Sequence, residues 1–261
     1  MIKSLKWLIF LPIFNFCCAL ALFLALLLLW VTAGEPKYKA NESNIVYISD
    51  VGAVHKTLFI VIGTVIGVLY VVTLVLDYVL RRRKLLRPME RRKSEKPLAI
   101  AAIFFGFIAC LGLILLTIFD AFNHSTLHWT FALIFFVGLA ISGGFNVAMI
   151  ALLHKDHPKS RLLKWSYRIK ICIIVLAVIC LICMIVLMSV CSKSSNKYDA
   201  QGNLSTSCNK EDSASAVFEW CIAFLFSFYL ATNTLDLWPY RGANIIANEL
   251  STTMSQITQN A

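Results

Sequence analysis

Residues 97–119 read PLAIAAIFFGFIACLGLILLTIF, a run of 23 positions without one charged side chain. An α-helix rises 1.5 Å per residue, so about 20 apolar residues cross the ~30 Å hydrocarbon core of a bilayer. Because lipid offers no hydrogen-bond partners to the backbone, a segment inside the bilayer satisfies its N–H and C=O groups by forming a helix. This stretch therefore predicts a transmembrane helix.

The composition of the whole chain agrees with that prediction. Of its 261 residues 59% are hydrophobic and 15% are charged, whereas about 25% of residues in soluble domains are charged. The polar surface is too small for a soluble enzyme, and the apolar residues are not arranged as heptads or G-x-y triplets. The net charge of +10 follows from the positive loops of a membrane protein, so we expect no nucleic-acid partner.

Six apolar stretches have the required length and together cover more than half of the chain. We predict an all-α, polytopic membrane protein, in which residues 1–239 form a bundle of six transmembrane helices and residues 240–261 form a polar cytosolic tail. The sequence Val31-Thr-Ala33 resembles a signal-peptidase site, but the long apolar block before it favours a retained first span over a cleaved one. The predicted spans are residues 7–31, 57–80, 97–119, 130–153, 171–190 and 216–238.

The distribution of basic residues predicts the orientation of the bundle. Of the 24 Lys and Arg residues, 18 fall before the first span, in alternate loops or in the tail, and positive loops stay in the cytosol during insertion. Both termini are therefore predicted to be cytosolic. The glycosylation sequons at Asn41 and Asn203 lie in loops assigned to the outside, where they are predicted to be modified, and a third at Asn123 lies close to the membrane.

The nine cysteines do not form a metal site in the sequence pattern. Cys191 and Cys208 alone share an outer, oxidising loop, so we predict that they form a disulfide. The Cys180-x-x-Cys183 pair has redox spacing but lies among aliphatic residues inside a span, which favours simple packing. No set of four ligands can be assembled with the histidines, and we expect neither a metal nor a cofactor.

Three ionisable residues lie at membrane depth, where charge is costly and often functional. Asp77 is four residues before Arg81, which predicts an ion pair at the cytosolic boundary. Asp236 stands beside Trp238 and is assigned an anchoring role at the same boundary. For Glu219 two interpretations remain open, a carboxylate at the N-terminus of the last helix and a role in a site on the outer side.

Uncharged small and polar residues also recur inside the spans. Gly63 with Gly67, and Gly138 with Ser142, are spaced so that helix backbones can approach closely, for packing within the chain or for a dimer. Packing within the chain is the favoured use. Asn146 and Asn233 are interpreted together as hydrogen-bonding groups between helices.

A cluster of basic residues follows the second span. Juxtamembrane cations attract anionic inner-leaflet lipid by about 1 kcal/mol each, and clusters of four to eight are typical of phosphatidylserine or phosphoinositide contacts. Two interpretations stay open, a topology signal without lipid selectivity and a site for inositol lipids that also includes residues 155–170. The candidate lipid-binding residues are Arg81, Arg82, Arg83, Lys84, Arg87, Arg91, Arg92 and Lys93.

Two segments give the chain a family resemblance. Tyr47-Ile-Ser-Asp-Val-Gly-Ala53, before the second span, and Phe218-Glu-Trp-Cys-Ile-Ala-Phe224, in the sixth, resemble the signature of the Frag/DRAM/Sfk membrane proteins. The resemblance covers residues 1–240 and implies a six-span fold. The charged loop after the second span favours the fungal branch of the family. The signature positions are Ser49, Asp50, Gly52, Glu219, Trp220 and Asp236.

The resemblance implies a range of roles but no established catalytic residue. Relatives include a fungal plasma-membrane factor that works with a phosphatidylinositol 4-kinase, a factor for GPI-anchor lipid remodelling, and lysosomal modulators of autophagy. We therefore expect a non-enzymatic regulator or scaffold for membrane lipid, with anionic lipid and a lipid-kinase complex as partners. The alternatives are GPI-lipid chemistry around Asp50 and Glu219, and autophagy modulation from a vacuolar or lysosomal membrane. A secretory-pathway membrane is expected, with the plasma membrane favoured over the vacuole, Golgi or ER.

Overall fold

The computed structural model describes residues 9–39, 42–86, 89, 94–194, 197–199, 202 and 204–238. Within these ranges the chain is all-helical, and six of its helices are long and apolar enough to cross a membrane. A short seventh helix, α2, was not predicted. The helices are α1 (Leu11–Thr32), α2 (Ile48–Val54), α3 (Lys56–Arg82), α4 (Glu95–Ile118), α5 (Ser125–Asp156), α6 (Arg161–Lys193) and α7 (Thr206–Leu237).

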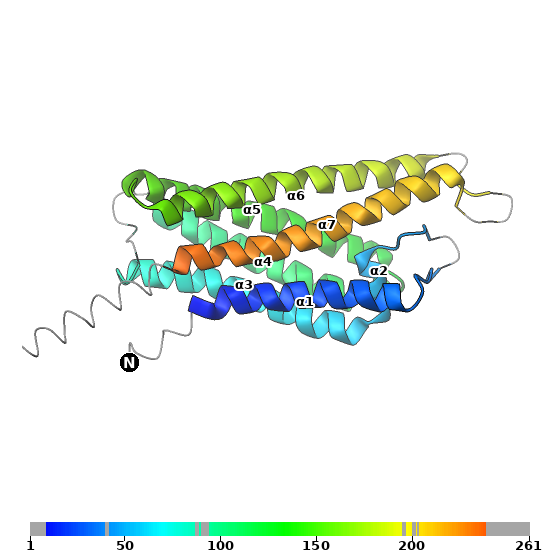
Figure 1. The fold of residues 1–261 in the computed structure, drawn as a ribbon, viewed down its shortest axis with the longest axis horizontal. Helices are drawn as coiled ribbons and strands as arrows, with labels where there is room; N and C mark the ends of the chain where they lie inside the picture. Colours follow the sequence, from blue (N-terminus) through cyan, green and yellow to red (C-terminus); the bar gives the residue numbers. More distant parts are fainter. Residues whose placement is uncertain are drawn as a thin grey trace, which may run out of the picture.

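The six long helices run alternately up and down and close into a ring (Figure 1). Each packs against its neighbours in the chain, and α7 returns to pack against α1, which also packs on α3. Helix α2 lies at the end of the bundle opposite the α5–α6 connection and contacts α1, α3 and α7 (Figure 1). We call the end that carries α2 the outer end and the opposite end the inner end, following the predicted orientation.

The helices at the α6–α7 corner are longer than the predicted spans. Helices α5, α6 and α7 have 32, 33 and 32 residues, and at 1.5 Å per residue each exceeds the ~30 Å hydrocarbon core. Their ends therefore extend into the headgroup region and beyond. Hydropathy detected only the part of each helix that lies in hydrocarbon, and so it placed the start of α7 ten residues too late.

Small residues allow close helix contacts inside the ring. A Cβ on Gly138 of α5 would lie 3.1 Å from the backbone nitrogen of Ala109 on α4, and one on Gly67 of α3 would lie 3.0 Å from Cys110 Sγ. Ser142 donates a hydrogen bond to the Ala102 carbonyl at 2.7 Å. The small-residue pairs thus face other helices of the same chain.

Helix α6 differs from the others because little of it is covered by protein. Only 6% of its most apolar window is buried, against 33–44% for the other five long helices. Val175, Ile179, Ile182 and Val186 are all exposed and recur at helical spacing along one face. In a membrane this face meets lipid chains.

Candidate functional site

A buried polar network joins three helices near the inner end. Lys170 of α6 has no exposed surface, and its ammonium donates hydrogen bonds to Asn146 Oδ1 at 2.6 Å and Asn233 Oδ1 at 2.9 Å. It also pairs with the Asp236 carboxylate, which accepts a further bond from Ser166 Oγ at 2.5 Å. The two asparagines do join helices, as the sequence predicted, but through a lysine that was assigned to a cytosolic loop.

This network corrects two sequence-based assignments. Asp236 is 3% exposed and is an internal ion-pair partner, not an anchor at the membrane surface. Lys170 cannot contribute to a lipid-binding surface because its charge is enclosed between α5, α6 and α7. A buried ion pair with all its hydrogen bonds made fixes geometry, although its net contribution to stability is small.

A second ion pair lies beside the first. Arg81 Nε donates to both oxygens of Asp77, at 2.8 and 3.0 Å, and Arg81 Nη2 lies 3.5 Å from the backbone oxygen of Asp236. The predicted pairing is present, but Arg81 is only 1% exposed. Arg81 therefore leaves the candidate lipid-binding set, because its guanidinium faces protein and not the membrane surface.

Exposed cations surround this network at the inner end. After α3 ends at Arg82, Lys84 adopts the left-handed conformation at φ 59°. The backbone N–H of Leu85 donates a hydrogen bond to the Leu80 carbonyl, which caps the C-terminus of the helix. Arg87, Arg91, Arg92 and Lys93 lie outside the described residues. Nine described cations are exposed at this end: Arg82, Arg83, Lys84, Lys96, Lys155, Lys159, Arg161, Lys164 and Arg168.

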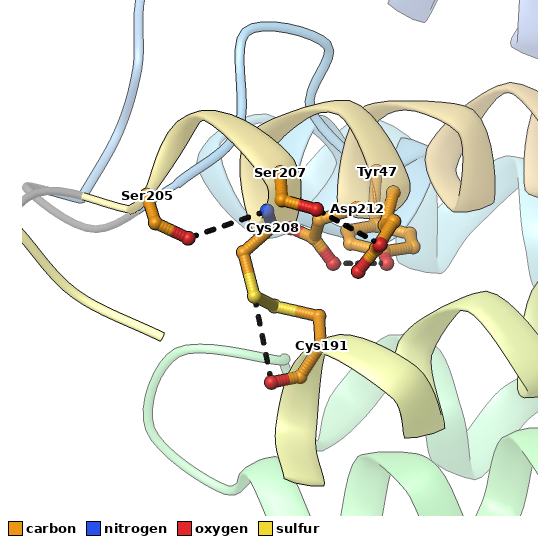
Figure 2. The surroundings of a disulfide bond; sticks show 7 residues. Tyr47, Cys191, Ser205, Ser207, Cys208 and Asp212 are labelled. Carbon is orange, nitrogen blue, oxygen red and sulfur yellow. Dashed lines mark hydrogen bonds between the residues drawn. A yellow bond between two sulfur atoms is a disulfide. The ribbon is translucent and has the colours of Figure 1, made fainter. Parts of the chain in front are cut away.

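At the outer end, the segment before α2 is bonded along one face of α7. Asn44 N donates to Asn209 Oδ1 at 2.8 Å, and the Tyr47 hydroxyl donates to Asp212 Oδ1 at 2.7 Å (Figure 2). Further along α7, Trp220 Nε1 donates to the Val46 carbonyl at 3.1 Å. The two family segments, far apart in the sequence, thus form one structural unit.

A disulfide lies next to this unit. Cys191 near the end of α6 is joined to Cys208 in the first turn of α7, on the side of α7 that also carries Asp212 (Figure 2). The bond ties the two helices together where they project beyond the predicted spans. Asn41 and Asn203, the predicted glycosylation sites, lie outside the described residues.

Glu219 holds α2 in place. Its Oε2 accepts a hydrogen bond from the backbone N–H of Ile48, the first residue of α2, at 2.7 Å. Because α7 begins at Thr206, Glu219 is 13 residues inside the helix, and the N-terminal interpretation was wrong. Asp236, the other acidic signature residue of α7, lies 17 residues further along the helix, about 25 Å away at the inner end.

Asp50 lies on α2 and is 7% exposed. Burial raises the pKa of its carboxyl to about 7, and the negative charge of Glu42 adds to the effect while Lys39 opposes it. Gly52 is required for packing, because a Cβ there would lie 2.5 Å from the ring of Phe59. Asp50 and Gly52 therefore shape the packing of α2 over the bundle.

A polar pair that the sequence did not reveal lies nearby. Lys56 Nζ, at the start of α3, lies 2.7 Å from Asp120 Oδ2 after α4. Asp120 also accepts a hydrogen bond from the backbone of Asn123 at 2.7 Å. Burial tends to raise the pKa of Asp120, but these bonds together bring that pKa below its ordinary value. Only the fold brings Lys56 and Asp120, 64 positions apart, into contact.

A largely apolar cavity lies beneath α2, with about 70 Å³ of free volume. Its polar lining is confined to Ser49, His128 and Glu219. Two of the six signature residues thus line a cavity, whereas Asp50 and Trp220 support the elements around it. No group of three or more His, Cys, Asp or Glu side chains suited to a metal occurs in the part of the chain that the structure describes.

These features define a class of protein: a six-span membrane bundle with an ion-paired inner end and an outer end covered by a short helix. The chain belongs to the family described as Frag1/DRAM/Sfk1/Cwh43P N-terminal domain, whose model matches residues 7–240. It is 31% identical over 216 residues to "Protein sfk1" of Schizosaccharomyces pombe. That alignment covers 83% of this chain and 59% of the relative. No solved structure matches the chain.

Proposed function

We propose that this protein is a non-enzymatic regulator of membrane lipid that binds anionic headgroups, phosphoinositides included, at its inner end. The observation that carries the proposal is the set of nine exposed cations that two interhelical connections bring to one end of the bundle. Cations next to a membrane attract anionic lipid by about 1 kcal/mol each. The buried Lys170 and Arg81 belong to the scaffold beneath this surface.

The inner network supports the proposal because it fixes the helices that carry the cations. Ser166 and Lys170 of α6 bond to Asp236, and exposed Lys164 and Arg168 lie on the same part of α6. Arg82 and Arg83 directly follow the paired Arg81. A rigid base holds charged side chains in a defined pattern, which favours multivalent headgroups over diffuse charge. A lipid-kinase complex is the protein partner that we propose for this surface.

Vesicle binding tests the proposal. The purified protein in phosphatidylcholine nanodiscs is mixed with vesicles that contain or lack phosphatidylinositol 4-phosphate. Neutralising Arg82, Arg83 and Lys84 together to Gln is expected to weaken binding to the inositol-lipid vesicles on the order of a hundredfold. The matched control neutralises Lys193, Lys197 and Lys210, three cations at the outer end.

The control variant is expected to bind like the wild type, and protease protection checks that neither variant changes topology. Unchanged binding by the Arg82/Arg83/Lys84 variant would overturn the proposal. An equal loss of binding in the control variant would show that net charge alone causes the effect. That result would also overturn the proposal.

Chemistry on GPI lipids at the outer end is the alternative function. It is favoured by the placement of Ser49 and Glu219 in one cavity and by the electrostatic interaction of Glu219 with Asp50. In this case Asp50→Asn and Glu219→Gln would alter GPI-lipid composition in cells, and the inner-end variant would be nearly silent. Imaging a tagged protein separates a plasma-membrane role, which we favour, from one in the Golgi or vacuole.

A further inference from the structure

The cavity beneath α2 is polar at one end and apolar along the rest of its length. Ser49 lies on α2, His128 lies near the outer end of α5, and Glu219 of α7 is bonded to the first residue of α2. Ile66, Leu139 and Phe226 line the part nearer the middle of the bundle. One water needs roughly 10–15 Å³ of such volume, so the cavity has room for several atoms beyond a single water. Its apolar length gives water no hydrogen-bond partners.

A second apolar cavity adjoins the first and is bounded by the lipid-facing helix α6. It has about 60 Å³ of free volume between α5, α6 and α7. Four residues line both cavities: Phe136, Leu139, Ile222 and Phe226. On its far side the second cavity is lined by α6, including the exposed Val178, and α6 is the helix least covered by protein. The two cavities thus lie side by side, one under α2 and one against α6, with these four side chains at their boundary.

The polar end presents hydrogen-bond acceptors. His128 Nδ1 lies 2.9 Å from the Leu116 carbonyl oxygen and 3.0 Å from that of Phe119. Carbonyl oxygens only accept, so Nδ1 carries the proton and Nε2 of the neutral ring is an acceptor. Glu219 is a second acceptor: its Oε2 is bonded to Ile48 N, and its carboxyl also interacts with the hydroxyl and the backbone N–H of Ser49. A ligand that fits here supplies a donor to His128 Nε2 and can share the Glu219 carboxyl with Ser49.

We propose that the two cavities bind one hydrocarbon chain of a membrane lipid. The chain enters between α5, α6 and α7, and a head group with hydroxyl or amino donors bonds to Glu219 and His128 under α2. The position of the cavities at bilayer depth, their apolar walls and their place beside the lipid-facing helix α6 favour a lipid chain over water or a polar solute. This site lies at the opposite end from the cationic surface and does not depend on it.

Photocrosslinking tests the site. The full-length protein is reconstituted in phosphatidylcholine vesicles with one of two probes that carry the same diazirine-labelled chain, a long-chain amino alcohol or phosphatidylcholine. The amino-alcohol probe is expected to label the peptides that contain Phe136, Leu139, Ile222 and Phe226, and excess unlabelled amino alcohol is expected to compete. The phosphatidylcholine probe, which lacks head-group donors, is expected to label them about tenfold less.

Two kinds of variant complete the test. Ala223→Trp fills the cavity and is expected to abolish internal labelling, whereas Ile182→Trp, on the lipid-facing side of α6, is expected to leave it intact. His128→Asn keeps a donor for the Leu116 carbonyl but loses the Nε2 acceptor, so it is expected to lower amino-alcohol labelling severalfold. If Ala223→Trp fails to fold by size-exclusion chromatography, Ala132→Phe fills the same cavity from α5.

Labelling confined to exposed faces, or unchanged by a folded cavity-filling variant, would overturn the proposal. Equal labelling by both probes would overturn the assignment of a donor-bearing head group. These outcomes are independent of vesicle binding by the inner end, so each site can fail alone.

Discussion

At the scale of single residues, Lys170 is the centre of the buried polar network. Its ammonium bonds to Asn146, Asn233 and Asp236 on two neighbouring helices. The sequence could not reveal this, because Lys170 follows a basic stretch and reads as its last member. Burial of a lysine depends on partners from distant segments, and only the packing of α5, α6 and α7 supplies them.

Removing one member of this ion pair is expected to destabilise the bundle. Lys170→Met leaves the Asp236 carboxylate buried and unpaired, which costs about 3–5 kcal/mol. Thermal unfolding in detergent micelles checks this, with the exposed Lys164→Met as the control, which is expected to behave like the wild type. Adding Asp236→Leu to Lys170→Met is expected to restore most of the loss. Equal stability of all three variants would contradict the burial of the pair.

Asp50 is expected to make the outer end sensitive to pH. Its pKa in the folded protein is about 7, above the ordinary value of 3.8, so the folded state keeps a proton that the unfolded state has lost. The contribution of the Asp50 proton to folding stability is therefore full below about pH 4 and is lost as pH rises to about 7. We expect a lower melting temperature at pH 8 than at pH 5, with a smaller difference in Asp50→Asn. A pH dependence unchanged by Asp50→Asn would contradict this assignment.

At the scale of elements, hydropathy located all six spanning helices because each carries an uninterrupted apolar run. Helix α2 was missed, since Ile48–Val54 is too short to span and its register depends on Glu219 and Trp220 of α7. The polar first turns of α7 were missed for a related reason: residues 206–215 form a helix outside the apolar region, where hydropathy gives no signal. The family resemblance, however, did select the two segments that meet there.

The disulfide between α6 and α7 is expected to stabilise the outer ends of both helices. Cys191 and Cys208 are 17 residues apart, and closing a loop of about this length is worth about 3 kcal/mol. Cys208→Ser is expected to lower the melting temperature and to remove its dependence on reductant. Cys172→Ser, at an exposed free cysteine, serves as the control. A reductant-independent wild type would show that the bond does not form in the membrane.

At the scale of the whole molecule, the ring places the two family segments at one end and the exposed cations at the other. One small bundle therefore carries two separate surfaces. The predicted orientation decides which leaflet of the membrane each surface faces. The sequence predicted the six-span bundle from apolar length alone. It did not predict the closure of α7 onto α1 or the cavities, because these depend on the shapes of packed side chains.

The orientation is open to a direct test. A protease-sensitive tag fused after Ala261 is expected to be cleaved when the plasma membrane of cells is permeabilised and to be protected when it is intact. A tag inserted at Gly202, between α6 and α7, is expected to be cleaved in intact cells as well as in permeabilised ones. Cleavage of the C-terminal tag in intact cells would place the cationic surface outside and would remove anionic inner-leaflet lipid as its ligand.

The lysine-centred network near the inner end also limits how the bundle can move. Sliding α6 past α7 by one helical turn, about 5.4 Å, would break the bonds of one ammonium to both neighbours at once. The network thus prevents α6 from sliding along α7, but it still allows the two helices to tilt relative to each other. We therefore expect the bundle to bend about a hinge at the inner end, with the amplitude of motion growing toward the outer end.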